Sequence, residues 1–464
     1  MVTKREPKEP RRIKALKKEA RNHNIKEGVF ATIKDSFGVH FISPFAIAIN
    51  SSNAMVAMLS SITGLLGPLS QISGSKLIEK YSRKKILLRA VLLEAFVWLP
   101  LILLAFLFNK GILTNMLPMV LLLFFSIYII FLNVGHPAWF SWTGDIVDEK
   151  YRGRWFSKRT LIIGFISVVL AIGASFFLDY FKNMGLTMYG FMILFFLAFL
   201  ARLMSWKIYK KEYEPKLKLK KGHYFSFGEF LLNAPKNNFG KFAIFRAFLG
   251  FATTISSALI AIYLLRQLGF AYTTYMIITL AGAFFSLIVL ELWGKFADKY
   301  GNYRVLRLTS ALIPLVPILW ILHPSPLYLI FVPQLVGGIA WAGFHLSAGN
   351  FIYDNVSKQK RGLAVSYYNM LLGMGVFLGA GLGALLIKYL TTNLLESIFT
   401  IFVISGIIRL IVVFWGIPKV KEIKKIGKFK SSRAIKDIVF KHGKSTLLEE
   451  AHEIMSIKKY LNTK

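Results

Sequence analysis

Four acidic residues in this sequence are each followed within a few positions by a basic residue. All four stand at the ends of long apolar stretches. The pairs are Glu79 with Arg83, Asp145 with Arg152, Asp298 with Arg304, and Asp354 with Arg361. Such a pair can bridge two helices at a membrane surface, and the carboxylate can also meet the positive N-terminus of a neighbouring helix. One exposed pair contributes under about 1 kcal/mol. Several together can bias one conformation, so the set predicts a conformational latch; the alternative is that these charges only fix topology and solubility.

Ionisable residues inside the apolar stretches are the second lead, because such groups are costly in hydrocarbon and usually face a cavity. Glu94 follows Arg89 by five residues, and Asp35 lies near the start of the first stretch. These three residues are candidates for proton coupling. For Glu94 the alternatives are a pair with Arg89 or a structural hydrogen bond between helices. Arg202 and Arg409 lie near the ends of their stretches, so we expect them to extend towards the interface.

The apolar stretches are long enough to cross a membrane. About 20 helical residues span roughly 30 Å of hydrocarbon, and the backbone must satisfy its own hydrogen bonds there. The expected spans are 29–50, 53–77, 86–108, 116–144, 155–177, 186–206, 242–265, 272–293, 305–322, 327–350, 363–388 and 394–417. The composition agrees, since only 17% of the residues are charged and the mean hydropathy is +0.54. Soluble domains carry about 25% charged residues. The sequence therefore predicts an all-α polytopic membrane protein with twelve transmembrane helices.

The net charge of +35 is explained by topology. Lys and Arg concentrate in the tails and in every second loop, as cytoplasmic segments do, and can contact anionic lipid headgroups. This distribution argues against nucleic-acid binding and places both termini in the cytoplasm. We expect five parts: a basic N-terminal arm at 1–28, a six-helix bundle at 29–208, a central loop at 209–241, a second bundle at 242–417, and a basic amphipathic tail at 418–464. Cysteine is absent, which excludes disulfides and thiol chemistry.

Two motifs occur twice along the chain. Residues 76–82 read KLIEKYS and residues 295–301 read KFADKYG, an offset of 219 positions. Asp145 precedes an Arg-Gly pair by seven positions, and Asp354 does the same 209 positions later. Such internal repetition predicts two similar halves in the same orientation. Duplicated halves with a site between them are a known transporter architecture.

These motifs resemble those of the major facilitator superfamily. Residues 294–304, GKFADKYGNYR, resemble its loop signature, in which Gly, an acid, Gly and a basic residue recur between two helices. The segment from Asp145 to Gly153 resembles its second cytoplasmic motif. The first-half copy departs from the signature, with Ser75, Glu79 and Ser82 standing where the second half has Gly294, Asp298 and Gly301.

The resemblance implies that the first, fourth, seventh and tenth spans line a central cavity. Polar and aromatic residues are frequent there and at the start of the eleventh span. The substrate-cavity candidates are His40, Asn50, Asn133, His136, Trp139, Arg246, Gln334, Trp341, His345 and Tyr367. Packing and interface contacts are the alternative role for each of them. Arg246 can face an anionic substrate. His136 and His345 stand at matching places, nine residues before Asp145 and Asp354, which suggests gating or proton handling.

The predicted function is secondary active or facilitative transport of a small solute by alternating access, with the proton as a candidate coupling ion. We expect a monomer in the plasma membrane that is not an enzyme and needs no cofactor or metal. A membrane sensor or lipid-handling protein on the same scaffold is the alternative, because fold does not fix function.

Overall fold

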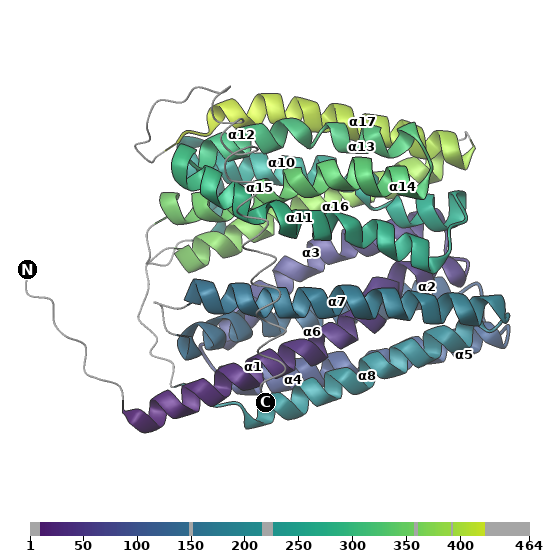
Figure 1. Cartoon of the computed structure of the whole chain (residues 1–464), viewed down its shortest axis with the longest axis horizontal. Coiled ribbons are helices and arrows are strands. Elements are labelled where there is room, and N and C mark those ends of the chain that lie inside the picture. Colours follow the sequence, from purple (N-terminus) through teal and green to yellow (C-terminus); the bar gives the residue numbers. More distant parts are fainter. Residues whose placement is uncertain (1–9, 148–151, 216–225, 357–360, 391–392, 423–464) are drawn as a thin grey trace, which may run out of the picture. The chain divides into compact units, whose positions relative to one another are not determined.

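The computed structural model describes residues 10–147, 152–215, 226–356, 361–390 and 393–422 (Figure 1). The side chains of 152–154, 157, 361 and 362 are also outside this part. Every regular element within it is a helix, so the all-α prediction is confirmed there. Most of the predicted tail at 418–464 and part of the predicted central loop lie outside the described residues.

The described residues of the first half form eight α-helices. They are α1 (Arg11–Phe37), α2 (Ile42–Ala48), α3 (Asn53–Leu77), α4 (Arg83–Phe96), α5 (Trp98–Asn109), α6 (Leu117–Ile146), α7 (Arg152–Asn183) and α8 (Thr187–Lys211). The second half forms α9 (Phe227–Asn233), α10 (Asn238–Ser257), α11 (Tyr272–Tyr300), α12 (Asn302–Leu312), α13 (Leu315–Leu322), α14 (Pro326–Leu329), α15 (Leu335–Asn355), α16 (Arg361–Tyr389) and α17 (Leu394–Gly416).

Eleven segments of the described chain are long and apolar enough to cross a membrane. They correspond to the predicted spans from the second to the twelfth. The first predicted span differs because its helix breaks at Gly38, between α1 and α2, where the Trp98 ring packs directly against the glycine backbone. A Cβ at Gly38 would lie 2.2 Å from that ring. The helix also begins at Arg11 rather than near Val29, so part of the sequence predicted as an arm continues the first helix.

Proline residues account for two other breaks within spans. Proline cannot donate a backbone hydrogen bond to the carbonyl four residues before it. The third crossing is divided into α4 and α5 just before Pro100, and the ninth is divided into α12 and α13 around Pro314 and Pro317. Each break releases a carbonyl oxygen that another group must satisfy.

The described chain divides into two compact units. The first comprises Met1–Lys221 with Ala258–Met276 and Ala380–Lys388; the second comprises Gly222–Ser257, Ile277–Gly379 and Tyr389–Lys464. Within the first unit, α1 lies along α8 and α3 along α6 (Figure 1). The Asp179 carboxylate in this unit accepts the backbone N–H groups of Tyr272 and Thr273, both at 2.8 Å, and so caps the start of α11.

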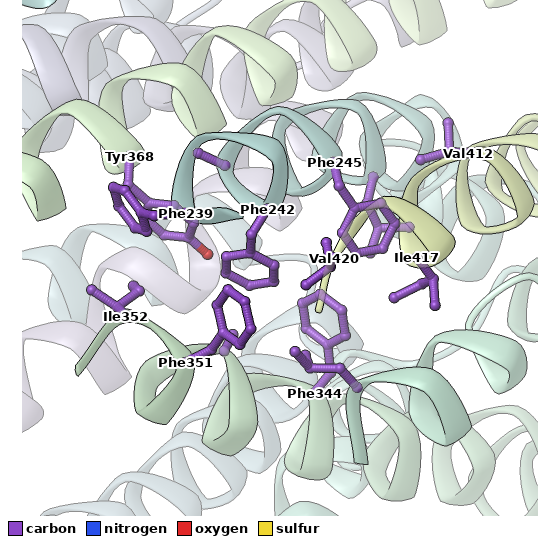
Figure 2. Packing of buried hydrophobic residues seen from close by; sticks show 14 of the residues in the cluster. Phe239, Phe242, Phe245, Phe344, Phe351, Ile352, Tyr368, Val412, Ile417 and Val420 are labelled. Atoms are coloured by element: carbon purple, nitrogen blue, oxygen red, sulfur yellow. The ribbon is translucent and has the colours of Figure 1, made fainter. Parts of the chain in front are cut away.

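Aromatic side chains form the interior of the second unit. Figure 2 shows Phe242 of α10 facing Phe351 of α15, with ring centroids 4.8 Å apart. Tyr368 of α16 stacks on Phe242 at 6.0 Å, and Phe245 lies 6.3 Å from Phe344. Burial of such rings supplies large dispersion and packing contacts at helix interfaces. This core holds α10, α15 and α16 together and fixes the register of their polar residues.

Small residues let α16 approach α10 closely. A Cβ at Gly375 would lie 2.1 Å from the Ala247 carbonyl oxygen, and one at Gly379 would lie 2.1 Å from the Phe251 carbonyl oxygen. Glycines four residues apart lie on one face of a helix, as packing interfaces in membranes use them.

We expect Gly375→Ala to destabilise the protein by about 1–3 kcal/mol, because the added methyl group must push the α10 backbone away. Gly381→Ala on the same helix is the control, since its Cβ would meet only Ser61 Oγ at 3.6 Å. Thermal unfolding in detergent measures both. Equal stability of the two variants would show that the close approach contributes nothing.

Candidate functional site

Arg83 is the buried centre of a polar cluster in the first unit. It is the first residue of α4, and Ser82 caps that helix by accepting the Lys85 N–H. The guanidinium forms a 2.5 Å ion pair with Asp145 of α6 and donates to Ser141 Oγ at 3.1 Å. It also pairs with Glu214 at 3.5 Å and donates to the Pro215 carbonyl at 2.7 Å. Since Arg83 is 0% exposed, these partners compensate a charge that has left water.

The second unit repeats this arrangement with an asparagine in place of the arginine. Asn302 stands 219 positions after Arg83, the offset of the first motif pair, and its amide donates to Asp354 at 2.9 Å. Asn350 donates to Asn302 Oδ1 at 3.1 Å; it stands 209 positions after Ser141, as Asp354 does after Asp145. The same three places of the repeat are therefore in contact in both units. Each contact joins the start of one helix to the end of another.

The latch residues have other partners than the pairs that the sequence suggested. Arg83 pairs with Asp145 and Glu214, and the contact links the two motifs rather than residues within one motif. Glu79 and Asp298 are exposed, and Arg304 donates to the Tyr300 carbonyl at 3.2 Å. The side chains of Arg152 and Arg361 lie outside the described part of the chain. Asn302 and Glu214 were missed because neither belongs to an acid–base pair in sequence, although the 219-residue offset pointed to Asn302.

A second polar cluster lies buried among α1, α4 and α8. Glu94 forms ion pairs with Lys34 at 3.0 Å and Arg202 at 2.6 Å. Lys34 also pairs with the half-exposed Asp35 at 2.6 Å and donates to the Tyr128 hydroxyl at 2.8 Å.

The cluster continues from Arg202 to a second carboxylate. Arg202 pairs with Glu27 at 3.3 Å, and Ser205 donates to Glu27 at 2.6 Å. Arg159 of α7 reaches the other Glu27 oxygen at 3.8 Å. Acids and bases thus alternate from Asp35 to Arg159, so the buried charges compensate one another.

The structure brings Glu94 and Asp35 together through Lys34 but leaves Arg89 apart. Glu94 is 0% exposed whereas Arg89 is exposed. Five residues on a helix correspond to a rotation of about 140°, which places them on different faces. Arg202 is buried in this network, so the expectation that it extends to the interface is wrong: two carboxylates hold it inside.

Arg409 of α17 is also buried, at 3% exposure, and does not extend to the interface either. It donates to the Ile313 carbonyl at 3.3 Å, the Thr253 carbonyl at 3.1 Å and Ser256 Oγ at 2.8 Å. Ile313 O is the carbonyl that Pro317 leaves without a helical donor. Arg409 therefore satisfies the backbone at the break between α12 and α13.

In each unit an arginine lies over a candidate tryptophan, and that tryptophan contacts a candidate histidine. In the first unit, His136 lies 6.0 Å from Trp139, over which Arg159 lies at 5.0 Å. In the second unit, His345 stacks on Trp341 at 5.2 Å, and Arg246 lies over the same Trp341 ring at 5.5 Å. The histidine side chains are exposed in both units. In each unit, therefore, one tryptophan contacts both an arginine and a histidine.

The remaining candidates have other surroundings. Asn133 accepts from Gln71 at 2.9 Å, and Gln334 donates to the Ile278 carbonyl at 2.6 Å. Tyr367 is buried against Phe227 and Phe230 in the aromatic core. His40 is half-buried in the turn between α1 and α2, and Asn50 is exposed with a φ of 59° between α2 and α3. Their polar side chains fit packing and turn roles that sequence alone could not separate from cavity roles.

Glu212, just beyond α8, is a buried carboxyl that the sequence analysis did not single out. It is 1% exposed, and Asn24 donates to one of its oxygens at 3.5 Å. Burial, with the nearby Glu27 charge, raises the pKa of Glu212 to about 8, while Lys84 and Arg159 act in the opposite direction. Its other oxygen has no hydrogen-bond partner. This carboxyl can therefore hold a proton near neutral pH.

Comparison with known proteins identifies the class. The sequence profile of the Major Facilitator Superfamily matches residues 28–249 and 242–448, so the chain belongs to this superfamily. It is accordingly a multi-pass membrane protein, and the predicted fold of twelve transmembrane helices in two six-helix bundles is confirmed.

Several solved structures are similar in fold. The nucleoside transporter NupG has a TM-score of 0.62 at 16% identity, with 87% of this chain and 98% of that chain covered. A bacterial homologue of the iron transporter ferroportin, in its inward-facing state, has a TM-score of 0.63 at 15% identity, covering 85% of this chain and 98% of that chain. A bacterial homologue of the human lysosomal transporter Spinster has a TM-score of 0.59 at 15% identity, with 88% and 99% covered. No curated protein matches the sequence.

Asp145→Asn and Asp354→Asn should have unequal effects. The first removes a charge that compensates buried Arg83, so we expect the free energy of unfolding to fall by about 1–3 kcal/mol. The loss is not larger because Asp145 is itself 45% exposed to solvent. The second leaves an amide oxygen that can still accept from Asn302, so the loss should be under about 1 kcal/mol. Thermal unfolding of both variants in detergent measures the two losses of stability. A larger loss for Asp354→Asn would contradict the charge argument.

Stability should fall as pH rises through the range in which Glu212 ionises. The folded protein keeps a proton that the unfolded chain has already lost above about pH 4.5, so this contribution is complete below pH 4.5 and disappears through about pH 8. Between these two pH values the free energy of unfolding should fall by at most about 1.4 kcal/mol per pH unit because of this one group. Glu212→Gln should reduce the pH dependence of the unfolding temperature between pH 5 and 8. Glu79→Gln, which changes an exposed carboxyl, is the control; an unchanged profile for Glu212→Gln would refute the assignment.

Proposed function

We propose that this protein is a secondary active or facilitative transporter that moves a small solute by alternating access. The supporting observation is the repeated contact of Arg83, Ser141 and Asp145 with its counterpart Asn302, Asn350 and Asp354. Each contact fastens helices of one unit to one another at equivalent places. Helices joined in this way move as one body, which a mechanism with two rocking bundles requires.

The proposed location is the plasma membrane, with both termini in the cytoplasm. The basic loops carry the latch residues Arg83 and Arg304, and positively charged loops remain on the cytoplasmic side. The latch contacts then lie at the cytoplasmic ends of the bundles. There they keep each bundle rigid.

The buried cluster of the first unit is the proposed place of proton coupling. Asp35 is 44% exposed at one end, and Lys34 links it to the fully buried Glu94. Protonation of either acid would weaken its ion pair with Lys34 and leave that cation with one carboxylate partner instead of two. A proton taken up at Asp35 would thereby change the charge balance between α1, α4 and α8.

Flux through liposomes that contain only the purified protein tests the proposal. Classes of small solutes are first screened by thermal shift, and uptake of those that stabilise the protein is measured with and without a pH gradient. We expect at least one solute to cross faster than in protein-free liposomes. Binding without any flux would favour a sensor or lipid-handling role on the same scaffold.

If Glu94 carries the coupling proton, Glu94→Gln should abolish uptake driven by the pH gradient but leave counterflow of the same solute. Arg89→Gln changes an exposed charge on the same helix and serves as the control. Gradient-driven uptake at the normal rate in Glu94→Gln would exclude this residue from coupling. Loss of counterflow as well would indicate a structural role.

A further inference from the structure

The buried charges of the two units are balanced differently. Among the described residues, the buried carboxylates are Glu27, Glu94 and Glu212, and all three belong to the first unit. The buried cations of the second unit are Arg246 and Arg409, at 8% and 3% exposure. Within the described part of the chain, no ion pair joins either arginine to a carboxylate.

Arg409 has an evident structural role, but Arg246 has not. Arg409 places its donors on two backbone carbonyls and a serine hydroxyl, at distances of 2.8–3.3 Å. Arg246 lies over the rings of Trp341 and Phe344, at 5.5 and 5.2 Å, and is also close to the Tyr368 side chain. Ring faces stabilise a cation by about 1–2 kcal/mol and do not neutralise it.

The first unit provides a matched comparison. Arg159 also lies over a tryptophan, Trp139, that contacts a histidine, but Arg159 reaches Glu27 at 3.8 Å. The equivalent carboxylate is missing beside Arg246 in the described second unit. A buried guanidinium without a carboxylate is costly unless an anion reaches it, because its charge has been taken out of water.

We propose that Arg246 is the anion-recognition residue of the solute site and that the transported solute carries a carboxylate or phosphate group. This inference rests on the proposed transport function and names its substrate class. The planar guanidinium can donate two parallel hydrogen bonds to two oxygens of such a group. Trp341 and Phe344 lie against the guanidinium, and the His345 ring stacks on Trp341.

Binding to the purified full chain tests this proposal independently of flux. The probes are benzoate, inorganic phosphate and benzamide at low ionic strength, and thermal shift is measured over a range of concentrations. Benzamide has nearly the shape of benzoate but no charge. We expect benzoate, phosphate or both to stabilise the protein and benzamide not to; the two anions distinguish carboxylate from phosphate recognition.

Arg246→Gln should weaken binding of the effective anion at least tenfold, whereas Arg246→Lys should retain part of it as a point charge. Arg307→Gln removes an exposed positive charge from the same unit and should leave binding unchanged. The proposal is overturned if neither anion binds the unmodified protein, if benzamide binds as well as benzoate, or if Arg246→Gln binds the anion normally.

Failure of this inference can be told apart from failure of the transport proposal. Flux of an uncharged solute, together with absence of anion binding, would leave the transporter intact and remove the anion site. Anion binding that depends on Arg246, without flux of any solute in liposomes, would support the site and refute transport.

Discussion

The compensation of buried charge is the constraint on which this structure depends most. A helix bundle in lipid has no water with which to solvate an ion, so every guanidinium, ammonium or carboxylate in its interior needs a partner. In the first unit, Lys34 and Arg202 share Glu94, and Arg202 and Arg159 share Glu27. These ion pairs join α1, α4, α7 and α8, so the same contacts that solve the electrostatic problem also hold the bundle together.

The second unit meets the same constraint with fewer charges. Asn302 takes the place of Arg83, and Ile313, 219 positions after Glu94, offers a backbone carbonyl to Arg409. Substitution of an amide or a carbonyl for a charged partner keeps the helix contact while it lowers the desolvation cost. Duplicated halves can therefore keep one geometry with different chemistry. Arg246 is the exception in this unit, because aromatic rings surround it and no carboxylate of the described residues pairs with it. A bound anion would supply the missing negative charge.

The proline breaks show how backbone and side chains are coupled. Pro317 leaves the Ile313 carbonyl without a helical donor, and the Arg409 guanidinium supplies one. Glycines have the complementary effect, since Gly38 and Gly375 let a tryptophan ring and a neighbouring backbone approach the helix directly. Bends and close approaches of this kind bring groups from distant spans into contact.

The sequence by itself determined the class of fold, the spans from the second to the twelfth and the repeat, because length, apolarity and motif spacing are local properties of the chain. It also indicated Arg83, Asp145, Asp354, Glu94 and Arg246, since charges near or inside hydrocarbon are informative wherever they stand. Only the tertiary structure decided which charges meet. The partners of Arg83 are 62 and 131 residues away, and those of Glu94 are 60 and 108 away. The charged groups that act on Glu212 come from α1, α4 and α7. Pairing over such separations depends on helix rotation and packing, which the local sequence does not specify.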